Sequence, residues 1–259
     1  MPEQLTVPRL PFTAEIWLTD TFGSCAVSLE VRGTNPGEPL EGARRALADF
    51  AAGADLGMFC GVGWSPQMSV GDWLPAPPTG PGRIHGRLSL SGVDVGAWRI
   101  LFHLLCRVHE SGPPLAAVSV TAEGAAGRPL NVSSLLARPL PGRTGNLPFR
   151  LMSQPVPDTK HPVVRITFAS SLSDEEFEHA AAAVQVWGRV VSTGGYLESW
   201  HSPEIGPMVM SEVYPLGPQT VEATTLVFES APEAFDGLVN LTARLHATFR
   251  PIASLEIRG

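Results

Sequence analysis

The chain of 259 residues has a formal net charge of −7, and it is 44% hydrophobic and 17% charged, which indicates a globular protein. The acidic balance argues against a protein that needs a basic face for nucleic acid or an anionic membrane. Residues 1–12 lack the apolar run of a signal peptide, and charged side chains interrupt the richest apolar stretch, 97–108. We therefore expect no membrane span, no nucleic-acid partner and a cytoplasmic location.

Parts of the sequence recur 137 residues apart. Arg107-Val108-His109 recurs as Arg244-Leu245-His246. Sliding the chain by this distance pairs 25–122 with 162–259, and 18 of the 98 pairs are identical, where composition alone gives roughly 7. We predict a tandem duplication. The expected divisions are a first repeat with an N-terminal extension at 1–122, a Gly/Pro/Ser-rich linker at 123–150 and a second repeat at 151–259.

The first repeat begins with an apolar stretch, 14–18, that predicts an additional edge strand. Apolar periodicity and the positions of Pro and Gly predict the elements that follow. They are a strand at 26–31, a helix from about 39 to 57, a strand at 83–91, a helix at 95–110 and a strand at 115–121.

The second repeat follows the same order. Ser173 and Glu176 have the spacing of a capping box, which predicts a helix that runs to about 191. The other predicted elements are strands at 163–168, 196–200, 221–229 and 252–257, a long Pro-rich loop after 200, and a helix from 232 to 248.

This element order, strand–helix–strand–strand–helix–strand, is that of the split βαβ arrangement. We therefore predict an α+β protein made of two ferredoxin-like βαββαβ units, each an antiparallel sheet with its helices on one face. The open sheet faces would cover each other, either in an α+β barrel about a pseudo-twofold axis or as side-by-side sheets. A monomer that resembles a dimer internally is the expected state.

The histidines and arginines shared by both repeats are candidate binding residues. His109 and His246 fall in the last turn of a predicted helix, where an imidazole can bond free carbonyl groups, so we favour a structural role over a ligand-binding one. Arg107 and Arg244 point away from the apolar stripe. They would be solvated, pair with a carboxylate of the other repeat, or form an anion-binding pair near the pseudo-twofold axis.

The long loop of each repeat contains large apolar and aromatic residues, which binding surfaces use. The alternative is that these loops fold back over the sheets. The candidate binding residues here are Trp64 and Trp73 in the first repeat, with Met68 and Leu74 nearby, and Trp200, His201 and Glu204 in the second, with Met208, Met210 and Tyr214 nearby.

Catalytic and metal-binding motifs are not apparent in the sequence. The three cysteines have no zinc-type spacing, and Cys60 is matched by apolar Leu197 in the second repeat, which favours packing over reactivity. We predict no cofactor and no metal, and leave open whether the chain is an enzyme. The leading hypothesis is a non-enzymatic protein-binding module, an immunity-type protein or regulatory adaptor, that uses an acidic surface and the Trp/Met-bearing loops. The alternative is an enzyme or small-molecule binder of the α+β-barrel type with a pocket within or between the repeats.

Overall fold

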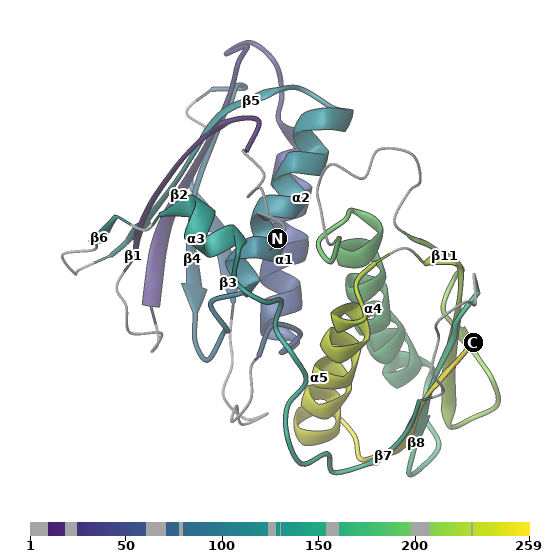
Figure 1. Ribbon diagram of the computed structural model, residues 1–259. Coiled ribbons are helices and arrows are strands. Elements are labelled where there is room, and N and C mark those ends of the chain that lie inside the picture. The colour runs from purple at the N-terminus through teal and green to yellow at the C-terminus, as the bar shows by residue number, and fades with distance from the viewer. Residues whose placement is uncertain are drawn as a thin grey trace, which may run out of the picture.

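The structure is a computed structural model that describes residues 10–18, 25–60, 71–77, 80–123, 128–129, 131–153, 161–197, 208–228 and 230–259. In these residues the chain has a mixed α+β fold with two mixed sheets and five helices. Figure 1 shows that the helices lie between the two sheets. Each sheet therefore has one face against helices and one face turned outward.

The first sheet has the strand order β3-β4-β2-β5-β1-β6. Neighbouring strands are antiparallel except β1 and β5, which run parallel with Thr13 opposite Ala117. Helices α1 (Glu41–Asp55) and α2 (Ala97–Ser111) lie on its inner face. The strands are β1 (Thr13–Leu18), β2 (Cys25–Gly33), β3 (Asp72–Pro75), β4 (Arg83–Leu90), β5 (Leu115–Ala122) and β6 (Arg128–Pro129).

The second sheet has the order β10-β11-β8-β12-β7, and β9 also pairs with β11. Here β7 runs parallel to β12, with Arg150 opposite Ser254. Helices α4 (Asp174–Ser192) and α5 (Glu233–Thr248) lie on its inner face. The strands are β7 (Arg150–Ser153), β8 (Val163–Phe168), β9 (Met208–Met210), β10 (Tyr214–Pro215), β11 (Thr220–Phe228) and β12 (Ile252–Arg258).

The expectation of purely antiparallel sheets is wrong, because each sheet contains one parallel pair. The strand that opens each half, β1 or β7, enters beside the last strand of that half and runs in the same direction. Alternation along the sequence predicts a strand but does not fix its direction, which depends on the neighbour it meets. The additional strand at 14–18 is present as β1, although β6 flanks it on the outer side.

The segment predicted as a linker is partly folded. It contains β6 and the short helix α3 (Val132–Leu136), whose N-cap Asn131 accepts hydrogen bonds from the backbone of Ser133 and Ser134. Helix α3 contacts α2 and β1. Leu135, Leu136 and Leu140 are buried, so this part of the segment belongs to the hydrophobic core.

The start of α4 is as predicted from the sequence. Ser173 accepts a hydrogen bond from the Glu176 backbone, and the Glu176 side chain accepts one from the Ser173 backbone, which completes the capping box. The predicted strand at 196–200 is wrong at Tyr196 and Leu197, which lie in the turn after the helix. Gly194 reverses the chain there with a φ of +96°, and Tyr196 is fully buried.

The two halves meet through their helices, which corrects the expectation that their open sheet faces cover each other. Helix α1 contacts α4, and Arg189 of α4 donates a 2.7 Å hydrogen bond to Asp49 of α1. The outer sheet faces need no cover because they are polar. Along β2, for example, buried Val27, Leu29 and Val31 alternate with Ser28, Glu30 and Arg32.

Candidate functional site

Exposed apolar side chains gather at one edge of the second sheet. Among the residues that the structure describes, five large hydrophobic side chains are exposed, and three of them lie within residues 208–216, which we call the edge segment. They are Val209 on β9 at 51% exposure, Tyr214 on β10 at 38% and Leu216 in the following turn at 46%. The other two, Trp17 and Leu74, lie on the first sheet.

A hollow of about 440 Å³ lies between β9 and α4, and we call it the methionine hollow. Met208 and Met210 line it from the strand, and Gly188 and Arg189 line it from the helix. Gly188 allows the close approach, since a Cβ atom there would overlap the Met210 thioether. The flexible, polarisable methionine side chains suit a surface that adapts to an apolar ligand group.

A second hollow of about 380 Å³ lies between the N-terminal end of α4 and the turn that joins β10 to β11. Leu172, Phe177, Pro215 and Pro218 form its apolar walls. Asp174 and Glu178 also line it, so we call it the acidic hollow.

Both hollows lie along the same face of α4. At 100° per residue, Asp174, Glu178, Gln185 and Arg189 fall within about 60° of one another around the helix. The first two line the acidic hollow and the last two line the methionine hollow. The edge segment contributes Pro215 to the former and residues 208–212 to the latter, so the helix and the sheet edge together bound both.

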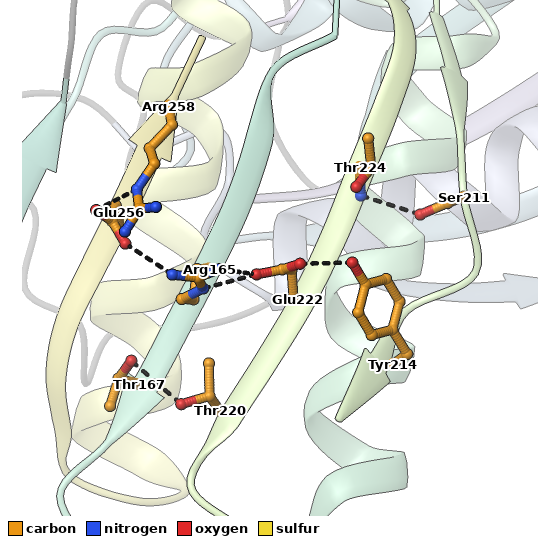
Figure 2. Close-up of polar contacts among 9 residues, drawn as sticks. All are labelled: Arg165, Thr167, Ser211, Tyr214, Thr220, Glu222, Thr224, Glu256 and Arg258. Carbon is orange, nitrogen blue, oxygen red and sulfur yellow. Dashed lines mark hydrogen bonds and ion pairs between the residues drawn. The ribbon is translucent and has the colours of Figure 1, made fainter. Parts of the chain in front are cut away.

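A polar network on the outer face of the second sheet holds the edge segment in place (Figure 2). Arg165 of β8 donates to Glu222 of β11 at 2.6 Å and to Glu256 of β12 at 3.4 Å. The Tyr214 hydroxyl donates to the other Glu222 oxygen at 2.5 Å. Burial raises the pKa of the Glu222 carboxyl, but the hydrogen bonds from Tyr214 and Arg165 outweigh burial and leave this pKa below its usual range.

This network is electrostatically balanced, because Arg258 also bonds Glu256, at 2.5 Å. Two arginines thus face two carboxylates. The hydrogen bond that the Tyr214 hydroxyl donates to Glu222 raises the pKa of Tyr214. Ser211 adds a second attachment, since its hydroxyl accepts from the Thr224 backbone at 2.9 Å. Together these contacts position β10 and the bend between β9 and β10.

The two helix-end histidines occupy matching positions. In each case Nδ1 accepts a 3.0 Å hydrogen bond from the backbone that starts the last strand of that half, from Leu115 to His109 and from Ile252 to His246. A phenylalanine ring lies beside each imidazole. The ring centres are 6.0 Å apart for Phe12 and His109 and 6.2 Å apart for Phe149 and His246. These contacts tie each helix to a strand.

The two candidate arginines lie at the contact between the halves. Arg107 pairs with Glu110 at 2.9 Å, and its side chain packs beside Gly194 of the second half. The charge of Arg244 acts on Asp55 and Cys60 of the first half. Arg107 therefore contacts the turn after α4, and Arg244 lies near enough to the end of α1 for its charge to act there.

The remaining candidates are far from the edge segment or outside the described residues. Trp73 lies on β3 with its indole against Gly86, packed on the core. Trp64, Trp200, His201 and Glu204 lie outside the described residues. Val209 and Leu216 were missed, because alternation does not reveal which residues an edge strand leaves exposed.

The buried cysteines lack the features of a reactive thiol. Burial is the main cause that raises the pKa of Cys60, and it raises the pKa of Cys106 to about 12. In the described parts of the chain no group of three His, Cys, Asp or Glu residues could hold a metal ion. None of the described helices is both long and apolar enough to cross a membrane.

Buried polar side chains lie at the contact between the halves. Asn240 of α5 is fully buried, and its amide nitrogen donates to the carbonyls of Met58 at 3.3 Å, Cys60 at 3.0 Å and Gly142 at 3.1 Å. Tyr196 is also buried there, against Gly237. These two side chains are part of the contact between the halves.

No protein-family model and no curated protein matches the chain. Among solved structures, a Cas6 product complex is 17% identical over 90% of this chain and 95% of that chain, with a TM-score of 0.21. A mutant of the ferredoxin protease FusC in complex with Arabidopsis ferredoxin is 10% identical over 95% of this chain and 39% of that chain, with a TM-score of 0.20. Likenesses at these TM-scores carry no argument about this chain.

Proposed function

We propose that the chain is a protein-binding module that takes up an extended segment of a partner protein along residues 208–216. The observation that carries this proposal is the concentration of exposed apolar side chains on a sheet edge that is bounded by two hollows. An edge strand offers unpaired backbone groups to an added strand, and neighbouring hollows accept alternate side chains of that strand.

The first half provides an internal comparison for this edge. Natural edge strands are commonly protected by charged residues. Strand β3 has exposed Asp72 at the position that corresponds, 137 residues earlier, to Val209 of β9. Gly71 and Trp73 correspond to Met208 and Met210. At this one position the second half thus has an exposed apolar side chain where the first half has an exposed charge, which favours strand addition to β9.

The proposal includes a tandem duplication of a ferredoxin-like βαββαβ unit. In support, both sheets contain the order of that unit, β3-β4-β2-β5 and β10-β11-β8-β12. The parallel strand pairs match in register. Thr13 faces Ala117 in the first sheet, and Arg150 and Ser254, which lie 137 residues after Thr13 and Ala117, face each other in the second. The hydrogen bonds to His109 and His246 show the same spacing.

The contact between the halves also has the form expected of a duplicated unit. His103 of α2 and Asn240 of α5 occupy matching positions. His103 bonds the backbone of Leu197, and Asn240 bonds the carbonyl of Cys60, which is the residue that matches Leu197. Each half thus reaches the same turn of the other, as in an isologous dimer.

Selection from a displayed library of peptides about ten residues long tests the function, because such peptides span the edge segment at about 3.4 Å per residue. We expect the immobilised chain to enrich peptides with a large apolar residue. Their affinity, measured by fluorescence anisotropy, should fall about tenfold in the variant Val209→Glu, because a carboxylate at this position opposes apolar packing against the strand. A tenfold fall in affinity corresponds to a loss of about 1.4 kcal/mol of binding free energy.

The matched control is Leu74→Glu, which places the same charge on the exposed edge strand β3 of the first sheet. It should bind the selected peptides as the unmodified chain does, and near-UV circular dichroism should show that both variants are folded. Failure to enrich any peptide, or equal binding by Val209→Glu and the unmodified chain, would contradict the proposal.

A further inference from the structure

We propose that the acidic hollow receives a lysine or arginine side chain of the same partner segment. This inference rests on the proposed function, and it specifies the chemistry of the partner: an extended segment with a basic residue and a separate apolar anchor. The acidic hollow and the methionine hollow lie toward opposite ends of one face of α4, so a single segment along the sheet edge would reach both.

The walls of the acidic hollow suit a long basic side chain. Its apolar part is formed by Leu172, Phe177 and two prolines, against which the methylene stem of a lysine or arginine packs. Asp174 and Glu178 are exposed acidic residues of the same lining. Their carboxylates would hold the charged head group by charge-assisted hydrogen bonds.

The two carboxylates are available for this purpose. Among the described residues no ion pair involves Asp174 or Glu178, whereas nearby Glu176 is engaged by Arg250 and by the Ser173 backbone. The net charge of −7 adds a favourable long-range attraction for a basic segment.

The first half again offers a comparison. Glu41 of α1 is the residue that matches Glu178, and it pairs with Arg44 three residues further on at 3.9 Å. Ala181 stands in the place of that arginine in the second half. The second half therefore has an acidic position without the intramolecular cation that accompanies it in the first.

The distance between the hollows sets the spacing of the two anchors. About twelve helical residues separate the middle of one lining from the middle of the other, which is about 18 Å along α4 at about 1.5 Å per residue. An extended segment covers this distance in about five residues. The basic residue should therefore lie about five positions from the apolar anchor.

The test uses the full chain and the displayed library described above. We expect the enriched peptides to contain lysine or arginine about five residues from the apolar anchor. Glu178→Gln should weaken their binding about threefold and Glu178→Lys about tenfold, because an exposed ion pair is lost in one case and replaced by repulsion in the other. Glu178 lies beyond the first turn of α4, so neither change should alter the unfolding midpoint.

The matched control is Glu41→Gln, which removes one negative charge at the corresponding position of the first half and should leave binding unchanged. Enriched peptides without a basic residue overturn the inference. It is also overturned if Val209→Glu weakens binding and Glu178→Lys does not, and this result leaves the proposed function intact. Absence of enriched peptides overturns both.

Discussion

At the scale of single residues, His103 and Asn240 join the two halves with different chemistry at matching positions. Asn240 is satisfied on both sides, since its side-chain oxygen also accepts from the Thr144 backbone at 2.7 Å. His103 is 3% exposed, and its Nδ1 has no hydrogen-bond partner among the described residues. Burial, reinforced by the charge of Arg99, lowers the pKa of His103 to about 4.

This pKa predicts a loss of stability in mild acid. In the unfolded chain the imidazole takes up a proton near pH 6.5, whereas in the folded chain it stays neutral down to about pH 4. The unfolded state therefore binds more protons in this window, and the free energy of unfolding falls by about 1.4 kcal/mol for each pH unit as the pH is lowered. Urea unfolding at a series of pH values measures the slope.

The variant His103→Asn installs the residue found at the matching position, Asn240, and should lose this slope between pH 6.5 and about 4. The control is His161→Asn, at an exposed position, which should retain it. An unchanged slope in His103→Asn would show that other groups cause the acid sensitivity.

Residue-scale features differ in how far the sequence predicts them. The position of His109 and His246 at a helix end follows from their place in the last predicted turn. The hydrogen bond that we predicted, to free carbonyl groups of the helix, is not the one that the structure shows, because Nδ1 of each imidazole accepts from the backbone N–H that starts the following strand. The exposure of Val209 does not follow from sequence, because a valine between two methionines reads equally as a buried strand residue. Which side of β9 is unpaired depends on the strand order of the sheet.

At the scale of elements, α4 bounds both hollows and so determines the shape of the candidate binding surface. Its first turn is fixed by the capping box, in which Ser173 is the N-cap. Replacing Ser173 by Ala should lower the free energy of unfolding by about 1 kcal/mol, since one backbone N–H of the first turn loses its acceptor. Thermal or urea unfolding measures this change.

The control for this cap is Ser171→Ala, an exposed serine two residues earlier that lies outside the capping box. It should leave stability within about 0.5 kcal/mol of the unmodified chain. Equal destabilisation by both substitutions would mean that the capping box does not determine the stability of α4.

Elements with strong local signals were predictable, and elements fixed by distant contacts were not. Periodicity and capping residues located the four long helices to within a few residues. The parallel direction of β1 and β7, and the turn at Tyr196, follow from packing against segments far along the chain. Local sequence carries little information about such contacts.

At the scale of the whole molecule, the two halves have different surfaces on similar frameworks. Their helices are packed together between the sheets, so the outer sheet faces and the sheet edges are what the molecule presents to other molecules (Figure 1). The sequence predicted two successive segments with the same order of elements. It did not predict that the two halves would contact each other through their helices. That arrangement leaves the edge segment of the second sheet accessible.

Hydrogen–deuterium exchange of the chain with and without a selected peptide tests strand addition most directly. We expect slower exchange of the backbone amides in residues 208–214 when the peptide is bound, because an added strand forms hydrogen bonds with β9 and β10, and no change in β3 at residues 72–74. Slower exchange confined to β3 or to the outer sheet faces, with residues 208–214 unchanged, would contradict strand addition at this edge.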